Sequence, residues 1–192
     1  LEPKDGYYNQ GITEFGEHGI IVSLKNKQTI NNESERKYDL YNTNLEQVNS
    51  KKITIDKKYF LNETFSDQHR LFSLFKNKKG DYTLVTIDAS NLEEIQVNGI
   101  VPKKAIIESM AILGDYAYLK TTIKRSPFLF AINWKTGEKK LIPVSIKDFS
   151  SKKLSLMNFQ ILKESNEIFL YVKVYIKNKK SDVYIIRLNN KG

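Results

Sequence analysis

The chain has 192 residues, of which 40% are hydrophobic and 28% are charged, and its formal net charge at pH 7 is +9. This length can bury one sizeable core or two small ones, and the composition is that of an ordinary globular protein. The absence of cysteine excludes disulfides, thiolate metal sites and cysteine nucleophiles. No apolar run approaches about 18 residues, so no segment predicts a membrane-spanning helix.

Short strands follow one another along the whole chain, and sustained helical periodicity is nearly absent. Four of the strands are apolar and end in Asn or Asp followed by a turn. Their closing residues are Asn42, Asp88, Asn133 and Asn189, at separations of 46, 45 and 56 residues. A period in this range, made of short strands, is typical of the blades of a β-propeller.

The sequence predicts four repeats of antiparallel strands, with four strands in each of the first three and three in the last. The predicted strands are Tyr8–Phe15, Gly19–Leu24, Arg36–Tyr41 and Glu46–Ile55 in the first repeat; Tyr59–Phe65, Leu71–Phe75, Tyr82–Ile87 and Glu93–Val97 in the second; Ile106–Leu113, Tyr116–Ile123, Pro127–Ile132 and Glu138–Val144 in the third; and Leu156–Leu162, Ile168–Ile176 and Val183–Leu188 in the fourth.

The predicted fold class is therefore all-β, a propeller-like array of about four antiparallel four-stranded blades with an incomplete last blade. A β-sandwich with accidental periodicity is the alternative. Residues 1–192 form either a single β-propeller-like domain or the N-terminal part of a larger propeller, and a start at Leu1 suggests a processed or trimmed chain. The third strands are the most continuously apolar, and the side chains expected in the core are Leu84, Ile87, Phe128, Phe130, Ile132, Ile185 and Leu188.

The repeat, an apolar strand closed by Asn or Asp as in Phe128–Asn133, resembles the bacterial β-propeller-like repeat proteins with degenerate blades. It lacks the signatures of WD and kelch repeats. The resemblance implies a rigid disc used for binding, in an extracytoplasmic place: periplasmic, cell-surface or secreted. The propeller domain of prolyl-oligopeptidase-type peptidases has similar blades, but this chain contains no Gly-x-Ser-x-Gly nucleophile turn.

Few residues suggest chemistry. His18 and His69 fall in corresponding turns of adjacent repeats, which places them on the same rim, and Glu17 or Asp67 could complete a metal site with them. Exposed turn histidines are the favoured interpretation. We therefore expect no catalytic residue, no cofactor and no metal site.

Lysines gather in one class of turns. The turns between second and third strands, and the connections between repeats, carry most of the lysine clusters, whereas the opposite turns lean acidic. Such a basic face would attract an anionic partner, although lysine-filled turns also keep a protein soluble. The candidate residues for anion or partner binding are Lys76, Lys78, Lys79, Lys103, Lys104, Lys177, Lys179 and Lys180.

The sequence thus favours a non-catalytic binding or scaffold module, not an enzyme, whose basic face engages a protein or an anionic surface polymer. One alternative is the propeller domain of a larger enzyme, such as a prolyl-oligopeptidase-type peptidase. A second is nucleic-acid binding, which is less favoured because few aromatic residues lie near the lysine clusters. The edge strand Val183–Leu188 is expected to be exposed and able to pair with another chain.

Overall fold

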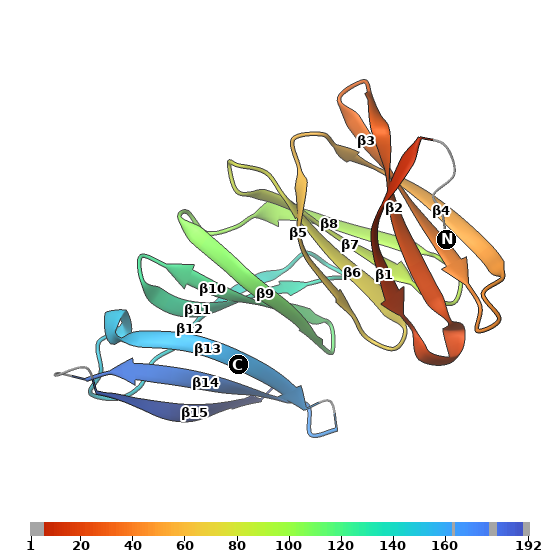
Figure 1. Ribbon diagram of the computed structural model, residues 1–192. Helices are drawn as coiled ribbons and strands as arrows, with labels where there is room; N and C mark the ends of the chain where they lie inside the picture. Colours follow the sequence, from red (N-terminus) through yellow and green to blue (C-terminus); the bar gives the residue numbers. More distant parts are fainter. Residues whose placement is uncertain (1–5, 163, 177–179, 190–192) are drawn as a thin grey trace. The chain divides into compact units, whose positions relative to one another are not determined.

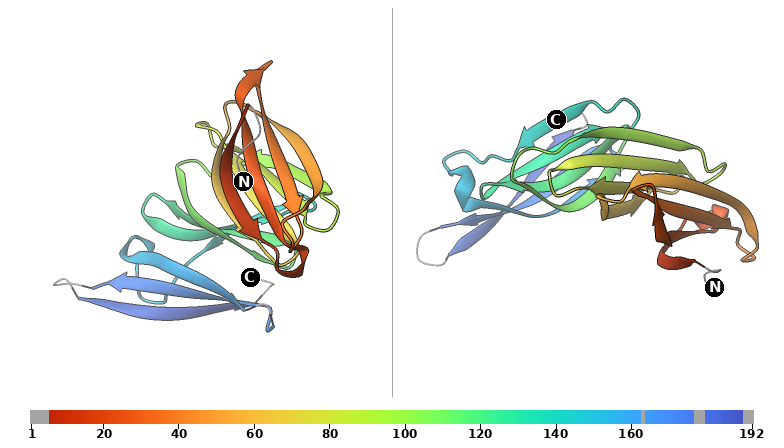
Figure 2. Two further views of the ribbon diagram at one scale, coloured as in Figure 1. Left: turned by 45° about the vertical axis from the view of Figure 1, so that its right-hand side comes forward. Right: turned by 90° about the horizontal axis from the view of Figure 1, so that it is seen from above.

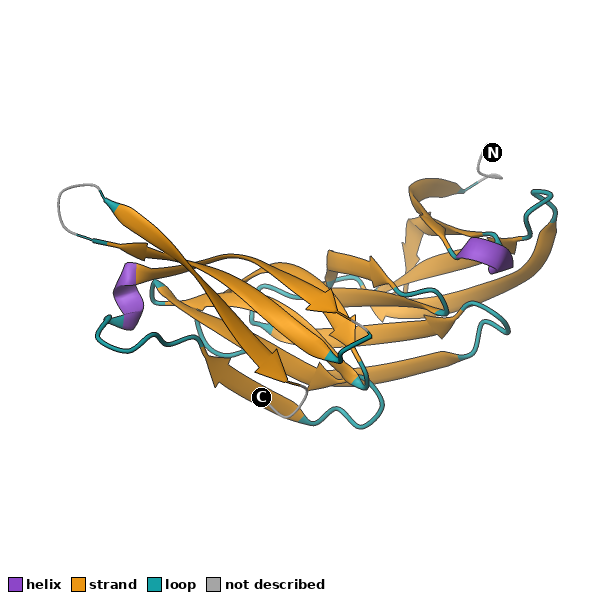
Figure 3. Cartoon of the chain, turned by 90° about the horizontal axis from the view of Figure 1, so that it is seen from below, coloured by secondary structure: helices purple, strands orange, loops and turns teal. Residues whose placement is uncertain are grey.

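The computed structural model describes residues 6–162, 164–176 and 180–189. This part of the chain consists of antiparallel strands and turns, and its only helical segments are two three-residue 3-10 turns, η1 (Gly16–His18) and η2 (Ser151–Lys153), drawn as helices in Figure 3. The all-β prediction is confirmed. Neither helical segment of the described chain has the length or the apolar character that crossing a membrane requires.

Strands that are consecutive in sequence are neighbours in the sheets, so that each sheet is a simple meander (Figure 1). Within the described residues there are four sheets, three with four strands and the last with three, as predicted. The first sheet contains β1 (Tyr7–Glu14), β2 (Ile20–Ile30), β3 (Glu33–Tyr41) and β4 (Gln47–Asp56); the second β5 (Phe60–Ser66), β6 (Arg70–Lys76), β7 (Asp81–Asp88) and β8 (Glu94–Ile100); the third β9 (Ala105–Leu113), β10 (Tyr116–Ile123), β11 (Ser126–Asn133) and β12 (Lys139–Pro143); and the fourth β13 (Leu154–Leu162), β14 (Glu167–Tyr175) and β15 (Ser181–Asn189).

The chain divides into two compact units, Leu1–Asn98 and Gly99–Gly192, and each has its own core. In the first unit the core joins both sheets, because Phe15 and Ile21 pack in one cluster with Leu71 and Phe75. In the second unit the core is built from apolar side chains of β11, β13 and β14, among others. The prediction that residues 1–192 form one domain, or part of a larger one, stays a prediction.

The third strands of the second and third sheets, β7 and β11, are largely buried, as their apolar sequences predict. The side chains confirmed in the core are Leu84, Ile87, Phe130 and Ile132. The prediction for Ile185 is wrong, since this side chain is 62% exposed, and Phe128 and Leu188 are only partly buried. On β15 the side chains of Ile186 and Leu188 pack against the core of the second unit, so Ile185 lies on the opposite face of the sheet and stays exposed. Among the described residues β15 pairs with β14 alone. The expected open edge is present, and its pairing with another chain stays a prediction.

In each of the four described sheets the first strand carries one residue that has no partner on the second strand. Each extra residue makes a β-bulge, which locally interrupts the ladder and re-aims a side chain. The four bulged residues are Gln10, Asn62, Glu108 and Met157. The sequence analysis did not predict this recurring bulge. The twist of the first sheet, β1–β4, is visible in both views of Figure 2.

Candidate functional site

Of the lysines proposed from the sequence, Lys78, Lys79, Lys103 and Lys104 lie in turns and are exposed, Lys180 is exposed just before β15, and Lys76 is the partly buried last residue of β6. Lys177 and Lys179 lie outside the described residues. In the first unit, strand β6 runs from Arg70 to Lys76. His69 directly precedes this strand, and Lys78 and Lys79 follow it, so the histidine and these lysines lie at opposite ends of β6. The binding of an anionic partner by these lysines stays a prediction.

A cleft that the sequence analysis missed lies between the two sheets of the first unit. It has a volume of about 310 Å³ and is lined by side chains from β1, β2 and β3 on one side and from β5 and β6 on the other. Its most unusual lining residue is Arg36, whose residue surface is only 3% exposed. Arginine is almost never buried to this degree without a charged partner.

Strand alternation explains why Arg36 is buried. In β3 the buried positions Ser34, Arg36 and Tyr38 are two residues apart and therefore lie on one face of the sheet. Glu35 and Lys37 occupy the opposite face, and the buried Asp39 belongs to it as well. The periodicity of two across Glu33–Tyr41 is the signal from which this arginine could have been found.

The carboxylates of β3 are engaged on that opposite face. Asp39 forms an ion pair with Lys37 at 2.8 Å and accepts a hydrogen bond from Ser50 Oγ at 2.7 Å. Glu35 accepts a hydrogen bond from the hydroxyl of Tyr7 and lies 3.2 Å from Lys52 Nζ. Neither carboxylate neutralises Arg36.

Two neutral groups hold the guanidinium of Arg36. Its Nη1 donates a hydrogen bond to Oε1 of Gln10, the bulged residue of β1, and its Cζ lies 4.5 Å from the centroid of the Phe75 ring. Its Nε is buried and has no hydrogen-bond partner. Among the ion pairs within 4 Å in the described chain, none involves Arg36. Burial lowers the pKa of the guanidinium, which nevertheless stays charged, as arginine does in proteins.

Hydroxyl groups make up much of the remaining polar lining of the cleft. Tyr38 is buried beside Arg36, and burial raises its pKa against the opposing effects of Ser73 and Arg36, so that it remains a protonated hydrogen-bond donor. The other hydroxyl-bearing residues of the lining are Thr13, Ser23, Thr64, Ser66 and Ser73. The cleft therefore combines one unpaired cation with several neutral donors and acceptors.

The two histidines lie together, as the repeat pattern predicts for corresponding turns. The centroids of the His18 and His69 rings are 6.0 Å apart, and both residues line a hollow of about 230 Å³ in the first unit. The structure does not add Asp67 or Glu17 as a third ligand: among the described residues, no group of three or more His, Asp or Glu side chains is placed to hold a metal ion.

No protein-family model matches the chain, and no curated protein matches its sequence. Solved structures resemble it in shape. An apocarotenoid oxygenase from Synechocystis is 7% identical, with a TM-score of 0.47 over 88% of this chain and 46% of that one. A polysaccharide lyase is 10% identical, with a TM-score of 0.46 over 95% of this chain and 45% of that one. A GH43 β-1,3-galactosidase is 8% identical, with a TM-score of 0.46 over 100% and 77% of the two chains.

The chain spans 46% and 45% of the length of the oxygenase and of the lyase. The expectation that the chain is not an enzyme is wrong as stated, because the solved structures that resemble it are those of enzymes: an oxygenase, a lyase and a galactosidase. A likeness at this level of identity transfers neither their reactions nor their substrates, since one fold hosts many functions.

Proposed function

We propose that the first unit binds a small organic anion that carries a carboxylate and several hydroxyl groups, such as a sugar acid or the acidic end unit of a polysaccharide. The observation that carries this proposal is the buried, charged Arg36, whose Nε lacks a partner and which faces a cleft between two sheets. A ligand oxygen would complete the hydrogen bonding that the protein leaves unfinished.

Charge selects a carboxylate among the possible anions. The guanidinium fork matches the geometry of both carboxylate and phosphate. Arg36 is the one cationic side chain of the lining, so its single positive charge balances a carboxylate. A phosphate monoester carries about −1.5 to −2 charges at pH 7 and would leave negative charge uncompensated in a partly buried site.

The size and polarity of the cleft select a small hydroxylated ligand. A volume of about 310 Å³ lies at the lower end of the range of small-molecule sites, about 300–1,000 Å³. Serine, threonine and tyrosine hydroxyls can both donate and accept, which suits ligand hydroxyls. Phe65 and Phe75 supply the apolar part of the wall.

Nitrogen-15 NMR of the arginine Nε–Hε groups tests the proposal directly. Glucuronate should shift the Arg36 signal in a saturable way, and glucose, which has the same ring without the carboxylate, should shift it far less. Arg36→Met should abolish glucuronate binding measured by calorimetry. Arg70→Met, which alters an arginine outside the lining of the cleft, should leave binding unchanged.

Two results would refute the proposal. One is an Arg36 signal that does not respond to glucuronate, to other hydroxylated carboxylates or to phosphate. The other is binding that survives in Arg36→Met. A response to phosphate that exceeds the response to glucuronate would keep the cleft as an anion site and reject the argument from charge.

A further inference from the structure

We infer that His18 and His69 form a two-histidine site for a borderline divalent transition-metal ion such as Zn²⁺. The site lies in the hollow of about 230 Å³ that Phe15, Gly16, Glu17, His18, Gln68 and His69 line. It is separate from the Arg36 cleft, and the two inferences stand independently because their lining residues do not overlap.

The spacing of the rings suits a shared metal ion. Two imidazoles on one tetrahedral zinc, with zinc–nitrogen distances of about 2.0–2.1 Å, have ring centroids about 5 Å apart. The observed centroid distance is 6.0 Å, with the ring planes inclined at 65°. A small rotation about χ1 of the exposed His69 side chain would close the difference of about 1 Å, and rotation about χ2, which leaves the ring centroid nearly in place, would then turn a ring nitrogen toward the ion.

His18 lies on a turn whose backbone is fixed. Its N–H donates to the Phe15 carbonyl at 3.1 Å, and the N–H of Gly19 donates to the Gly16 carbonyl at 3.1 Å. Gly19 has φ +93°, and a Cβ there would lie 2.0 Å from the carbonyl oxygen of Tyr41. This close approach ties the turn to the end of β3, so His18 is presented from a defined backbone position.

His69 is fixed in the same manner on the neighbouring sheet. Its N–H donates to Asp67 Oδ1 at 2.8 Å, and its carbonyl accepts from the N–H of Ala89 at 2.7 Å. Because the backbone is held at both positions, only the side-chain torsions of the two histidines must be ordered when they bind the same ion, which favours a chelate.

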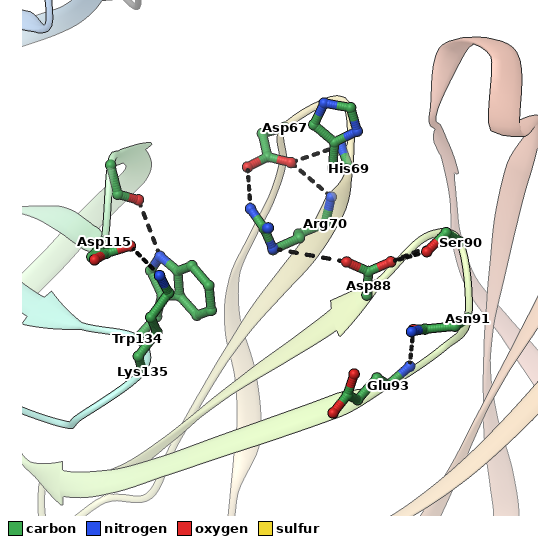
Figure 4. A network of polar contacts seen from close by, with 11 residues as sticks. Asp67, His69, Arg70, Asp88, Ser90, Asn91, Glu93, Asp115, Trp134 and Lys135 are labelled. Carbon is green, nitrogen blue, oxygen red and sulfur yellow. Dashed lines mark hydrogen bonds and ion pairs between the residues drawn. The ribbon is translucent and has the colours of Figure 1, made fainter.

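The charges around the pair favour a cation. Arg70 lies between two carboxylates, with Nη1 at 3.9 Å from Asp67 Oδ2 and Nε at 4.0 Å from Asp88 Oδ2, and Figure 4 shows this network beside His69. Glu17 lines the hollow itself. The carboxylates of Glu17, Asp67 and Asp88 thus lie near the histidine pair together with one guanidinium, that of Arg70. Their excess of negative charge raises the local concentration of cations. Water molecules would fill the remaining coordination positions, and they would be more numerous than in catalytic zinc sites, which have three protein ligands and one open position.

The composition of the chain makes the test unusually clean. The protein contains two histidines and no cysteine, so every imidazole signal comes from this pair and no thiolate competes for the ion. The untagged protein is titrated with ZnCl₂ while the ring protons of the histidines are followed by NMR. Both histidine signals should move together with one saturation curve and a stoichiometry of one ion per chain.

Variants separate a shared site from isolated histidines. His18→Gln and His69→Gln should each weaken zinc binding at least about 10-fold, because even residues outside the first coordination shell commonly contribute that much. Arg36→Met should leave zinc binding unchanged, so failure here is distinguishable from failure of the anion site. Independent titration of the two rings, or unaltered affinity in either histidine variant, would overturn the inference. Folding of each variant is checked by its dichroism spectrum, and a variant that fails to fold is replaced by the corresponding Asn substitution.

Discussion

Replacement of Arg36 by Met should make the ligand-free protein more stable, although it removes a charged residue from the interior. Arg36 is 3% exposed, its Nε has no hydrogen-bond partner, and its guanidinium contacts the neutral side chains of Gln10 and Phe75. Methionine replaces the aliphatic stem of Arg36 and reaches about as far as its Nε, so it keeps the packing of the stem without the cost of burying a charge and leaves the place of the guanidinium to the cleft.

The magnitude follows from opposing contributions. Removing an unsatisfied buried donor recovers about 1–3 kcal/mol, and removing a buried charge recovers several kcal/mol more. The substitution loses a charge-assisted hydrogen bond to Gln10, about 1.5–3 kcal/mol, and a cation–π contact with Phe75, up to about 2 kcal/mol. The net expectation is a gain of about 1 kcal/mol, equivalent to a rise of about 2–4 °C in Tm for a chain of this size.

Urea denaturation of wild type and variant, with and without a saturating sugar acid, measures this directly. Arg70→Met is the matched control: its side chain is 35% exposed and pairs with two carboxylates, so its loss should cost up to about 1 kcal/mol. Ligand at 100 times its Kd should add about 2.7 kcal/mol to wild type and nothing to Arg36→Met. A loss of more than about 2 kcal/mol in ligand-free Arg36→Met would show that the arginine organises the fold, and the reasoning would be wrong.

Three further predictions concern the turns, one bulge and the lysines. Gly19→Ala should destabilise the protein by more than the ~1–2 kcal/mol expected for Gly16→Ala, because both positions have positive φ but only the Cβ at position 19 meets backbone atoms; equal urea midpoints would contradict this. Burial raises the pKa of Glu108, but hydrogen bonds from Lys120 and Thr122 outweigh burial and hold the pKa below the ordinary value of 4.5. Wild type should therefore be more stable than Glu108→Gln above pH 4.5, and this difference in unfolding free energy should vanish as the pH falls through the lowered pKa of the folded state. A difference that is independent of pH would argue against the ion pair. Joint replacement of Lys78, Lys79, Lys179 and Lys180 by Gln should weaken binding to dextran sulfate at low salt and make little difference near 0.5 M salt, where the Debye length is about 4–5 Å; equal binding by both proteins at low salt would return these lysines to a role in solubility.

Sequence patterns predicted the strands well because the blade repeats its apolar third strand. Ile132 lies in a continuously apolar run and Leu84 in a run interrupted only by threonine, as strands covered on both faces do, and both side chains are fully buried. The same rule failed for Ile185, because only one face of the last sheet is covered by the core of the second unit, and Ile185 lies on the other face. The Arg36 site was missed for a different reason. Arginine is usually a surface residue, so its side chain alone does not predict burial. Only its spacing of two residues from the buried Tyr38 along β3 shows that Arg36 faces inward.

The recurring bulge allows one side chain in each sheet to vary without a change in strand pairing. A bulged residue is left out of the regular ladder, so its side chain can change while the strand pairing is kept. The four sheets have Gln, Asn, Glu and Met at this position, and these side chains make different contacts. Gln10 accepts a hydrogen bond from Arg36, and a carboxylate oxygen of Glu108 lies 2.8 Å from Lys120 Nζ. Exchanging Gln10 for Glu would place a carboxylate where the guanidinium now contacts a neutral amide, and would close the anion site from within. The same one-residue insertion thus gives each sheet a position whose side chain can vary while the strand pairing around it is retained.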